Sequence, residues 1–218
     1  MDARRMVETQ IRSRGITDPA VLRAMETVPR HLFVPAELRS EAYEDHPLPI
    51  GYGQTISQPY IVALMTQMLR LHPGDRVLEI GTGCGYQTAV LATIAQDVYS
   101  VEIVPELAVE AANRLMELGY TNAQVCQGDG YEGWAEHAPY QGIMVTAAAP
   151  DVPPPLVEQL ADGGRLVIPV GVYLAGQDLW LLEKQGTRVQ RTNLGGVLFV
   201  PLVRKVTRRG TSAMEDRP

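Results

Sequence analysis

The most informative pattern in the chain is Val77-Leu78-Glu79-Ile80-Gly81-Thr82-Gly83-Cys84-Gly85-Tyr86-Gln87. Its first four residues predict a buried strand, and the apolar positions from Gln87 to Ala95 predict a helix directly after the turn. Glycines at positions 81, 83 and 85 allow the backbone to pass close to a ligand, while the helix N-terminus presents unpaired N–H groups and a positive dipole. The turn therefore predicts a binding site for a carboxylate or a phosphate.

The glycine spacing separates two classes of anionic cofactor. A dinucleotide fingerprint requires a glycine where this chain has Tyr86. The pattern therefore favours the methionine carboxylate of S-adenosylmethionine over the pyrophosphate of a dinucleotide. A tight connection between strand and helix, without any ligand, is the alternative interpretation of the turn taken alone.

Short β-branched runs alternate with helical segments on the C-terminal side of this turn. Strands are predicted over 77–80, 98–103, 123–126, 142–146 and 165–170, and helices over 87–95, 105–118 and 154–161. Such alternation predicts an α/β protein with a mostly parallel sheet covered by helices on both faces, a three-layer Rossmann-like fold. Further on, residues 179–183 and 188–191 flank a turn like an antiparallel hairpin, and residues 197–203 predict a last strand.

The N-terminal third predicts a helical extension. Asp18 and Pro19 are typical of a helix start, and a second helix is predicted from Pro59 to near His72-Pro73-Gly74. Between these helices, the prolines and glycines of residues 44–57 predict a long loop that is neither helix nor regular strand. Long loops in compact domains are often functional.

Chain length predicts one domain over residues 1–206. Within it, residues 1–75 are expected to supply the N-terminal helices and the substrate loop, and residues 76–206 the cofactor-binding core. Residues 207–218 are polar and are expected to form a disordered tail.

Composition bears on partners and compartment. The 218 residues carry 19 Lys and Arg against 25 Asp and Glu, a net charge of −6, which gives no footprint for nucleic acid. No apolar run approaches the roughly 18 residues of a membrane span, and the first residues are polar, so we expect a cytoplasmic protein. Cys84 and Cys126 lack neighbours at metal-binding spacing, so we expect free thiols and no metal site.

Two acidic residues strengthen the cofactor hypothesis. Glu102 ends the strand over 98–103, where a carboxylate can accept hydrogen bonds from both ribose hydroxyls. Asp129 follows the strand over 123–126 and can accept a hydrogen bond from the adenine amino group. A solvated strand-end charge and a turn aspartate are the alternative interpretations. Together with the glycine turn, the two residues fall at successive strand ends on one edge of the sheet, which favours S-adenosylmethionine.

Blocks of sequence along the chain resemble the protein-L-isoaspartate O-methyltransferase family. The resembling blocks are residues 28–35, 47–60, 77–87, 128–130, 145–150, 163–171 and 200–202, so the likeness runs from about residue 4 to residue 203. Residues 53–59 are the discriminating block, because the glycine turn is common to many methyltransferases. The resemblance implies that Ser57 is the active-site residue and that residues 55–57 line the junction of cofactor and substrate.

The resemblance and the residues together give a candidate site. The expected cofactor contacts are Gln54, Thr55, Ile56, Ser57, Glu79, Gly81, Thr82, Gly83, Cys84, Gly85, Glu102, Ile103, Asp129 and Gly130. The expected substrate contacts are Ile56, Ser57, Ala147, Ala148 and Ala149, where small or apolar side chains can form a dry slot. Cys84 is interpreted as a filler of the turn rather than a nucleophile.

The implied reaction moves the methyl group of S-adenosylmethionine to the free carboxylate of L-isoaspartyl residues in damaged proteins, with S-adenosylhomocysteine as the product. The methyl ester then cyclises to a succinimide, which hydrolyses partly to aspartate. Isoaspartyl-containing proteins and peptides are the expected partners of a monomeric enzyme. The chain departs from the family where an aspartate usually precedes the fourth strand, since Gln141-Gly142 stand there.

Two other functions are alternatives. A small-molecule or RNA methyltransferase could share the fold, although an RNA or DNA amino-methylating enzyme is expected to carry an Asn/Asp-Pro-Pro-Tyr block where this chain has Ala148-Ala149-Pro150-Asp151. The second alternative is a non-enzymatic cofactor-binding module, in which residues 53–57 would have no function.

Overall fold

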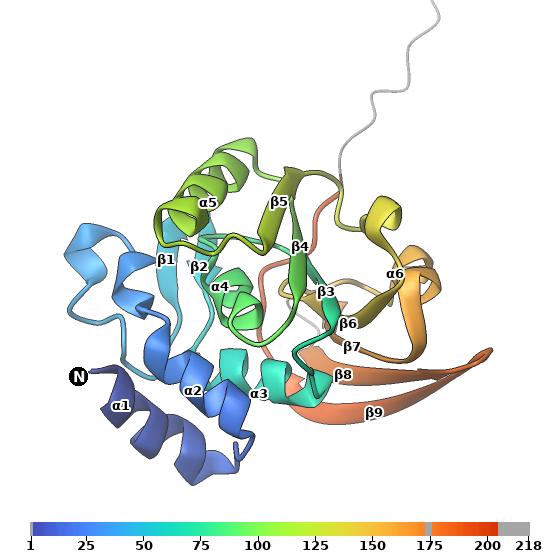
Figure 1. Ribbon diagram of the computed structural model, residues 1–218, viewed down its shortest axis with the longest axis horizontal. Coiled ribbons are helices and arrows are strands. Elements are labelled where there is room, and N and C mark those ends of the chain that lie inside the picture. Colours follow the sequence, from blue (N-terminus) through green and yellow to red (C-terminus); the bar gives the residue numbers. More distant parts are fainter. Residues whose placement is uncertain (1, 173–175, 205–218) are drawn as a thin grey trace, which may run out of the picture.

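The computed structural model describes residues 2–172 and 176–204 (Figure 1). Its main sheet has seven strands in the order β5-β4-β3-β6-β7-β8-β9. The strands are β3 (Arg76–Ile80), β4 (Asp97–Glu102), β5 (Ala123–Gln127), β6 (Tyr140–Val145), β7 (Leu160–Val172), β8 (Gly176–Gln185) and β9 (Arg188–Val197). The first five are parallel to one another, whereas β8 and β9 are antiparallel. The predicted fold class is confirmed.

Helices cover both faces of this sheet. They are α3 (Pro59–Leu69), α4 (Tyr86–Ala92), α5 (Pro105–Glu117) and α6 (Pro154–Gln159). Side chains alternate between the faces along each strand. Val77 therefore belongs to the same buried cluster as Met65 of α3 and Leu91 of α4, while its neighbour Leu78 belongs to a second cluster with Leu156 of α6. The strand order changes direction between β3 and β6, which is where open α/β sheets bind ligands.

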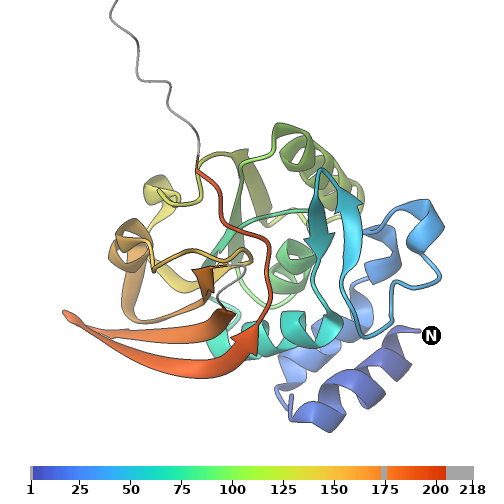
Figure 2. The same cartoon turned by 180° about the vertical axis from the view of Figure 1, so that it is seen from behind.

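The N-terminal helices pack beside α4 and form a separate layer at one side (Figure 2). Helix α1 (Ala3–Met6) continues through a π-helical turn (Val7–Ile11) and a 3-10 turn (Arg12–Arg14), and α2 (Pro19–Thr27) follows. Short 3-10 turns lie at Arg30–Leu32, Ala36–Leu38 and Ala135–His137. The predicted start of α2 is confirmed, because the Asp18 side chain accepts hydrogen bonds from the N–H groups of Ala20 and Val21.

The prediction of an irregular loop over residues 44–57 is wrong. Strands β1 (Leu48–Gly51) and β2 (Gln54–Ile56) form an antiparallel hairpin outside the main sheet. Tyr52 and Gly53 turn the chain with φ values of 53° and 71°. Proline is tolerated here because a strand of a two-stranded hairpin has no partner on its second edge. Glycine and proline therefore mark a hairpin rather than exclude one.

The prediction of a strand over residues 197–203 is also wrong. Strand β9 ends at Val197, and the chain then crosses the edge of the sheet with an isolated bridge between Pro201 and Ala148. The Ala148 N–H donates to the Val200 carbonyl, and the Leu202 N–H donates to the Ala148 carbonyl. Proline has no N–H to extend this ladder. The predicted tail, 207–218, lies outside the described residues.

No helix within residues 2–172 and 176–204 is long and apolar enough to cross a membrane.

Candidate active site

The glycine turn after β3 has a backbone conformation that only glycine adopts easily. Gly81, Gly83 and Gly85 have φ values of 95°, 54° and 87°. A Cβ on Gly81 would lie 2.4 Å from Thr146 Oγ1, and the Gly81 N–H donates to the Val101 carbonyl at 2.8 Å. The turn is thus fixed between the ends of β4 and β6.

Three cavities open around this turn. The strand-edge cavity is lined by Gln54, Thr55, Ile80, Gly81, Gly83, Val101, Glu102, Ile103, Val104, Gly130, Thr146, Ala147 and residues 200–203. The turn cavity is lined by Thr55, Ile56, Ser57, Val62, Met65, Gly81, Thr82, Gly83, Cys84, Tyr86, Gln87 and Thr146. The apolar groove, about 690 Å³ in volume, is lined mainly by α3 and residues 194–200. Thr55 and Thr146 line all three, so the cavities meet beside these residues.

Glu102 is a buried carboxylate in the wall of the strand-edge cavity. It is 5% exposed, and its two oxygens accept hydrogen bonds from the N–H groups of Gly83 at 2.8 Å and Val104 at 3.0 Å. Backbone donors offset the cost of burying the charge. Each oxygen has a second lone pair, so the carboxylate can also accept hydrogen bonds from ligand hydroxyls.

Glu79 is placed differently. Its Oε2 accepts hydrogen bonds from Thr88 Oγ1 at 2.5 Å and Ser100 Oγ at 2.6 Å, and Ser100 Oγ also bonds Thr82 of the turn. Complete burial raises the pKa of Glu79 to about 8. Because Glu79 lines none of the three cavities, it supports the turn from within.

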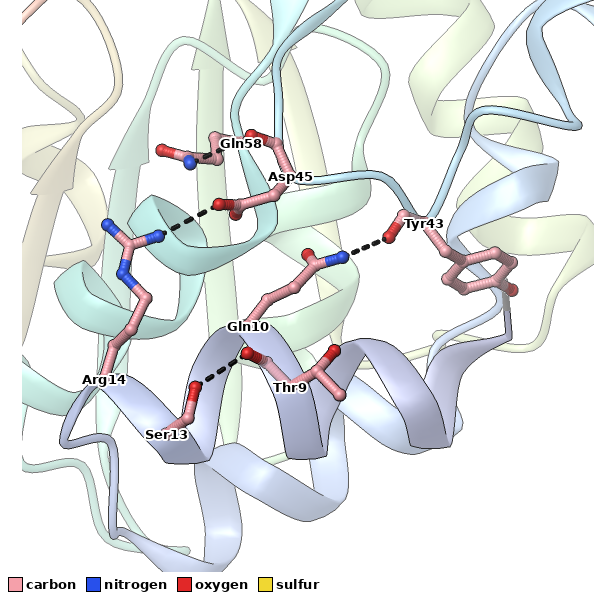
Figure 3. A network of polar contacts seen from close by, with 7 residues as sticks. All are labelled: Thr9, Gln10, Ser13, Arg14, Tyr43, Asp45 and Gln58. Carbon is pink, nitrogen blue, oxygen red and sulfur yellow. Dashed lines mark hydrogen bonds and ion pairs between the residues drawn. The ribbon is translucent and has the colours of Figure 1, made fainter.

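The Ser57 segment is held from behind by the N-terminal part of the chain. Arg30 donates to the Ser57 carbonyl at 2.7 Å and to the Ala42 carbonyl at 2.6 Å. Figure 3 shows a second attachment, in which the Gln58 side chain donates to the Asp45 carbonyl and the Asp45 carboxylate pairs with Arg14 at 3.1 Å. Half-buried Ser57 thus faces the turn cavity and the apolar groove from a segment fixed to the core.

The structure brings most of the predicted site residues to the cavity walls. Those that line a cavity are Gln54, Thr55, Ile56, Ser57, Gly81, Thr82, Gly83, Cys84, Glu102, Ile103, Gly130 and Ala147. Those that do not are Glu79, Gly85, Asp129, Ala148 and Ala149. Gly85 caps α4, and Asp129 accepts a hydrogen bond from the Tyr131 N–H. Ala148 and Ala149 lie behind the walls, where their backbone groups bond residues 200, 202, 169 and 171.

Sequence reasoning missed Thr146 and residues 200–203 as cavity walls. Thr146 Oγ1 donates to the Gly81 carbonyl at 2.6 Å and has a second contact of 3.0 Å with the Ile80 carbonyl. Its position directly after β6, at the point where the strand order changes direction, could have indicated it. Residues 200–203 reach the cavity only through the tertiary path of the chain.

Several other side chains do not enter the site. Burial raises the pKa of the Cys84 thiol, so a nucleophilic role is disfavoured. None of the four histidines lines the three cavities. Gln141 lies at the opposite end of β6, where it accepts a hydrogen bond from the Arg76 N–H. Across the described ranges, no cluster of three or more His, Cys, Asp and Glu side chains is arranged to hold a metal ion.

Comparison with known proteins decides the family. The family model of protein-L-isoaspartate(D-aspartate) O-methyltransferases matches residues 1–207. The chain belongs to this family. A protein-L-isoaspartate O-methyltransferase from Picosynechococcus is 59% identical over 198 residues, covering 91% of this chain and 88% of the relative. One from Opitutus terrae is 58% identical over 200 residues, covering 92% and 86%.

Solved structures agree with this membership. A protein-L-isoaspartate O-methyltransferase superposes with a TM-score of 0.82 at 31% identity, covering 91% of this chain and 65% of the other. A Plasmodium falciparum chain solved in complex with S-adenosyl-L-homocysteine superposes with a TM-score of 0.81 at 25% identity, covering 94% and 100%. The methyl donor of this methyltransferase is S-adenosylmethionine.

Proposed function

We propose that this chain carries out the reaction of its family where the three cavities meet, with Ser57 orienting the acceptor. The reaction transfers the methyl group of S-adenosylmethionine to the free carboxylate of an L-isoaspartyl residue. The observation that carries the placement is that Thr55 and Thr146 line the strand-edge cavity, the turn cavity and the apolar groove together. A donor on the sheet edge and an acceptor in the groove would therefore meet beside Ser57.

The sheet edge supplies the groups that would hold the cofactor. Glu102 would accept the ribose hydroxyls, and the turn from Gly81 to Gly85 would receive the methionine part. Gly130 would border the adenine ring, and the Asp129 carboxylate, which accepts a hydrogen bond from the Tyr131 N–H, would also accept one from the adenine amino group. The fit is supported by Gly81, where an added Cβ would meet Thr146, and by Glu102, whose carboxylate stays in the cavity wall. When bound, the cofactor supplies an electrophilic methyl group on a sulfonium.

The acceptor side requires no general base. A carboxylate of this kind ordinarily has a pKa near 4, so the isoaspartyl acceptor is already ionised and nucleophilic at neutral pH. Ser57 can orient it by one hydrogen bond, and correct alignment of two reactants lowers a barrier by several kcal/mol. Ile56 and Ala147 present apolar walls that exclude water. The methyl ester then leaves and cyclises to the succinimide without enzyme.

The apolar groove would hold the polypeptide that flanks the isoaspartyl residue. It begins at Ser57 and continues between α3 and residues 194–200. Its walls include Ile61, Leu64, Leu179, Leu194, Val197, Leu198 and Phe199. An open apolar groove suits flexible segments of many sequences better than one fixed partner.

We also propose the coarser properties of the enzyme. Residues 1–206 act as one domain, supported by packing of the N-terminal helices against α4. A cytoplasmic enzyme is supported by the free thiols of Cys84 and Cys126. A monomer is supported by the scatter of exposed apolar side chains over separate elements. The net charge of −6 supports the absence of a nucleic-acid partner.

The test uses two synthetic peptides that differ only in an L-isoaspartyl or L-aspartyl linkage. With labelled S-adenosylmethionine, the isoaspartyl peptide should be methylated and its aspartyl twin ignored. Equal methylation of both peptides would remove the proposed specificity.

A further inference from the structure

Within residues 2–172 and 176–204, two arginines are buried, and one of these two has a counter-ion. Arg165 is 8% exposed, donates through Nε to the Met68 carbonyl at 2.6 Å and pairs with Glu183 at 2.7 Å. Arg30 is 0% exposed and donates through Nε to the Ala42 carbonyl at the same distance. Among the described residues, no Asp or Glu lies within ion-pair distance of Arg30. Burying an unpaired charge is costly, so Arg30 needs an explanation.

The neighbours of Arg30 do not neutralise its charge. They are two carbonyl oxygens and the ring of Tyr86, whose centroid lies 4.8 Å from the guanidinium carbon. Nη1 has no hydrogen-bond partner among the described atoms. Burial raises the pKa of the nearby Tyr86, Cys84 and Tyr43, so these groups are uncharged at neutral pH. Arg30 therefore presents a net positive charge to its surroundings.

That charge lies directly behind one wall of the turn cavity. Arg30 hydrogen-bonds the carbonyl of Ser57, its guanidinium lies over the ring of Tyr86, and Cys84 is within electrostatic reach. Ser57, Cys84 and Tyr86 all line the turn cavity. A fixed charge in a low-dielectric wall acts strongly on whatever binds in front of it.

We propose that Arg30 is a positioning residue whose fixed positive charge favours a ligand carboxylate bound against Ser57 in the turn cavity. The inference rests on the proposed function, which brings two carboxylates to this place: that of the isoaspartyl acceptor and that of the methionine part of the cofactor. Arg30 is fully buried and lines none of the three cavities, so either carboxylate would feel its charge through the wall of the turn cavity and without direct contact. An uncharged group of the same shape, such as the methyl ester product, would gain nothing from Arg30.

The charge acts on binding more than on the transfer step. Transfer removes one positive charge from the sulfonium and one negative charge from the acceptor together, so a fixed cation near both changes the barrier little. Interactions that are equal in the ground state and the transition state lower KM without raising kcat. The carbonyl hydrogen bond to Ser57 is a separate contribution, which orients the segment.

Two ligand pairs differ in a carboxylate and separate its two sources, and the peptide pair also keeps the shape of the ligand nearly constant. The first pair is S-adenosylhomocysteine and 5′-methylthioadenosine, which lacks the amino-acid part. The second pair is an isoaspartyl peptide and the same peptide with that carboxylate converted to an amide, both measured with saturating S-adenosylhomocysteine. This thioether has no sulfonium charge, so any preference for the carboxylate comes from the protein. Dissociation constants are measured by calorimetry.

Three variants of the full chain are compared with the natural protein. Arg30→Gln removes the charge but keeps hydrogen-bond donors, and Arg30→Lys keeps the charge. Arg165→Gln is the matched control, because it removes a buried guanidinium that has its own counter-ion. We expect Arg30→Gln to weaken the binding of the carboxylate-bearing ligand of one pair about tenfold. The binding of the ligand without the carboxylate should weaken less than about twofold. Arg30→Lys should restore most of the preference, and Arg165→Gln should leave it unchanged.

The pair that responds identifies which carboxylate Arg30 serves. A natural protein that shows no preference within either pair would overturn the proposal without any variant. Equal weakening of charged and uncharged members by Arg30→Gln would also overturn it, because that result indicates a merely structural role. If Arg30→Gln does not fold, Arg30→Lys decides: retained preference supports the proposal and lost preference in a folded protein overturns it. Methylation of the isoaspartyl peptide by the natural protein tests the proposed function separately.

Discussion

The proposed cofactor half and the proposed acceptor half of the site are built in different ways. The cofactor half consists of turns that follow neighbouring parallel strands, and backbone groups hold it together: the Gly81 N–H bonds Val101, and the Gly83 N–H bonds Glu102. The acceptor half is assembled from distant segments, and side chains hold it together. Arg30 reaches Ser57 across 27 residues, and Gln58 reaches Asp45 across 13.

This difference predicts two kinds of sensitivity. Where the backbone itself forms the wall, an added methyl group should lower both cofactor affinity and stability. Removal of one side chain there should have a smaller effect on both. Where side chains fix a loop, a single truncation should affect chemistry and leave cofactor binding in place.

The largest effect is expected from Gly81→Ala. The added Cβ would lie 2.4 Å from Thr146 Oγ1 at a φ of 95°, so either the Thr146 hydroxyl rotates and loses its bonds to the Ile80 and Gly81 carbonyls, or the turn and β6 move apart. We expect cofactor affinity to fall at least about 100-fold and stability by about 2–4 kcal/mol. Gly53→Ala in the β1–β2 hairpin is the control, since nothing lies within 4 Å and only the φ of 71° opposes it, at about 1 kcal/mol. For both variants, calorimetry measures cofactor affinity and thermal unfolding measures stability. Equal losses of affinity and stability in the two variants would contradict the idea that backbone packing holds the glycine turn in place.

Ser57→Ala probes the other half. Losing one hydrogen bond to a charged acceptor is worth about 1.5–3 kcal/mol, so kcat should fall about 10- to 100-fold while cofactor binding is retained. Ser13→Ala, which removes an exposed hydroxyl that bonds Thr9, should leave kcat unchanged. Steady-state kinetics with the isoaspartyl peptide gives the answer. Loss of cofactor binding with unchanged kcat would assign Ser57 to the wrong half.

Glu102→Gln tests a side chain of the proposed cofactor half. The variant keeps one acceptor oxygen but loses the charge, so the dissociation constant of S-adenosylhomocysteine should rise by the equivalent of about 1–3 kcal/mol, with the fold intact. Exposed Glu136 lies elsewhere, and Glu136→Gln is the control. An unchanged dissociation constant in calorimetry would show that Glu102 does not bind the ribose.

How well the sequence predicted each half follows from the same difference. Strand, glycine turn and helix are encoded within the short stretch 77–87, and Glu102 was found because parallel strands end at one edge. The β1–β2 hairpin was missed because Pro49 argued against a strand. Residues 200–203 were missed because only the tertiary path of the chain brings them to the strand-edge cavity. A buried arginine without an acidic partner leaves no pattern in a sequence, so Arg30 had no predicted role.

Glu79 makes a smaller contribution, which depends on pH. Its folded pKa of about 8 exceeds the ordinary glutamate value of 4.5, so between these values the folded state keeps a proton that the unfolded state has released. Stability should therefore fall as pH rises through this window and level off above about 8, with a slope below about 1.4 kcal/mol per pH unit. Glu79→Gln stays neutral, so its slope should be shallower. Urea unfolding at several pH values tests this, and identical slopes would contradict a neutral Glu79.

The smallest effects are expected from the histidines, and they test whether the acceptor half contains a base. His31 bonds Tyr43, His72 lies near Asp75, and His137 stacks on the ring of Tyr99, so each has a structural environment outside the three cavities. If the acceptor arrives already ionised, replacing His31, His46, His72 or His137 by glutamine should change kcat by less than about twofold. For the natural protein, kcat should also not rise between about pH 6 and 8 in a way that depends on any one of these histidines. A variant that still folds and binds cofactor but has lost both activity and such a rise would reveal a general base, and Ser57 would then no longer suffice as the group that prepares the acceptor.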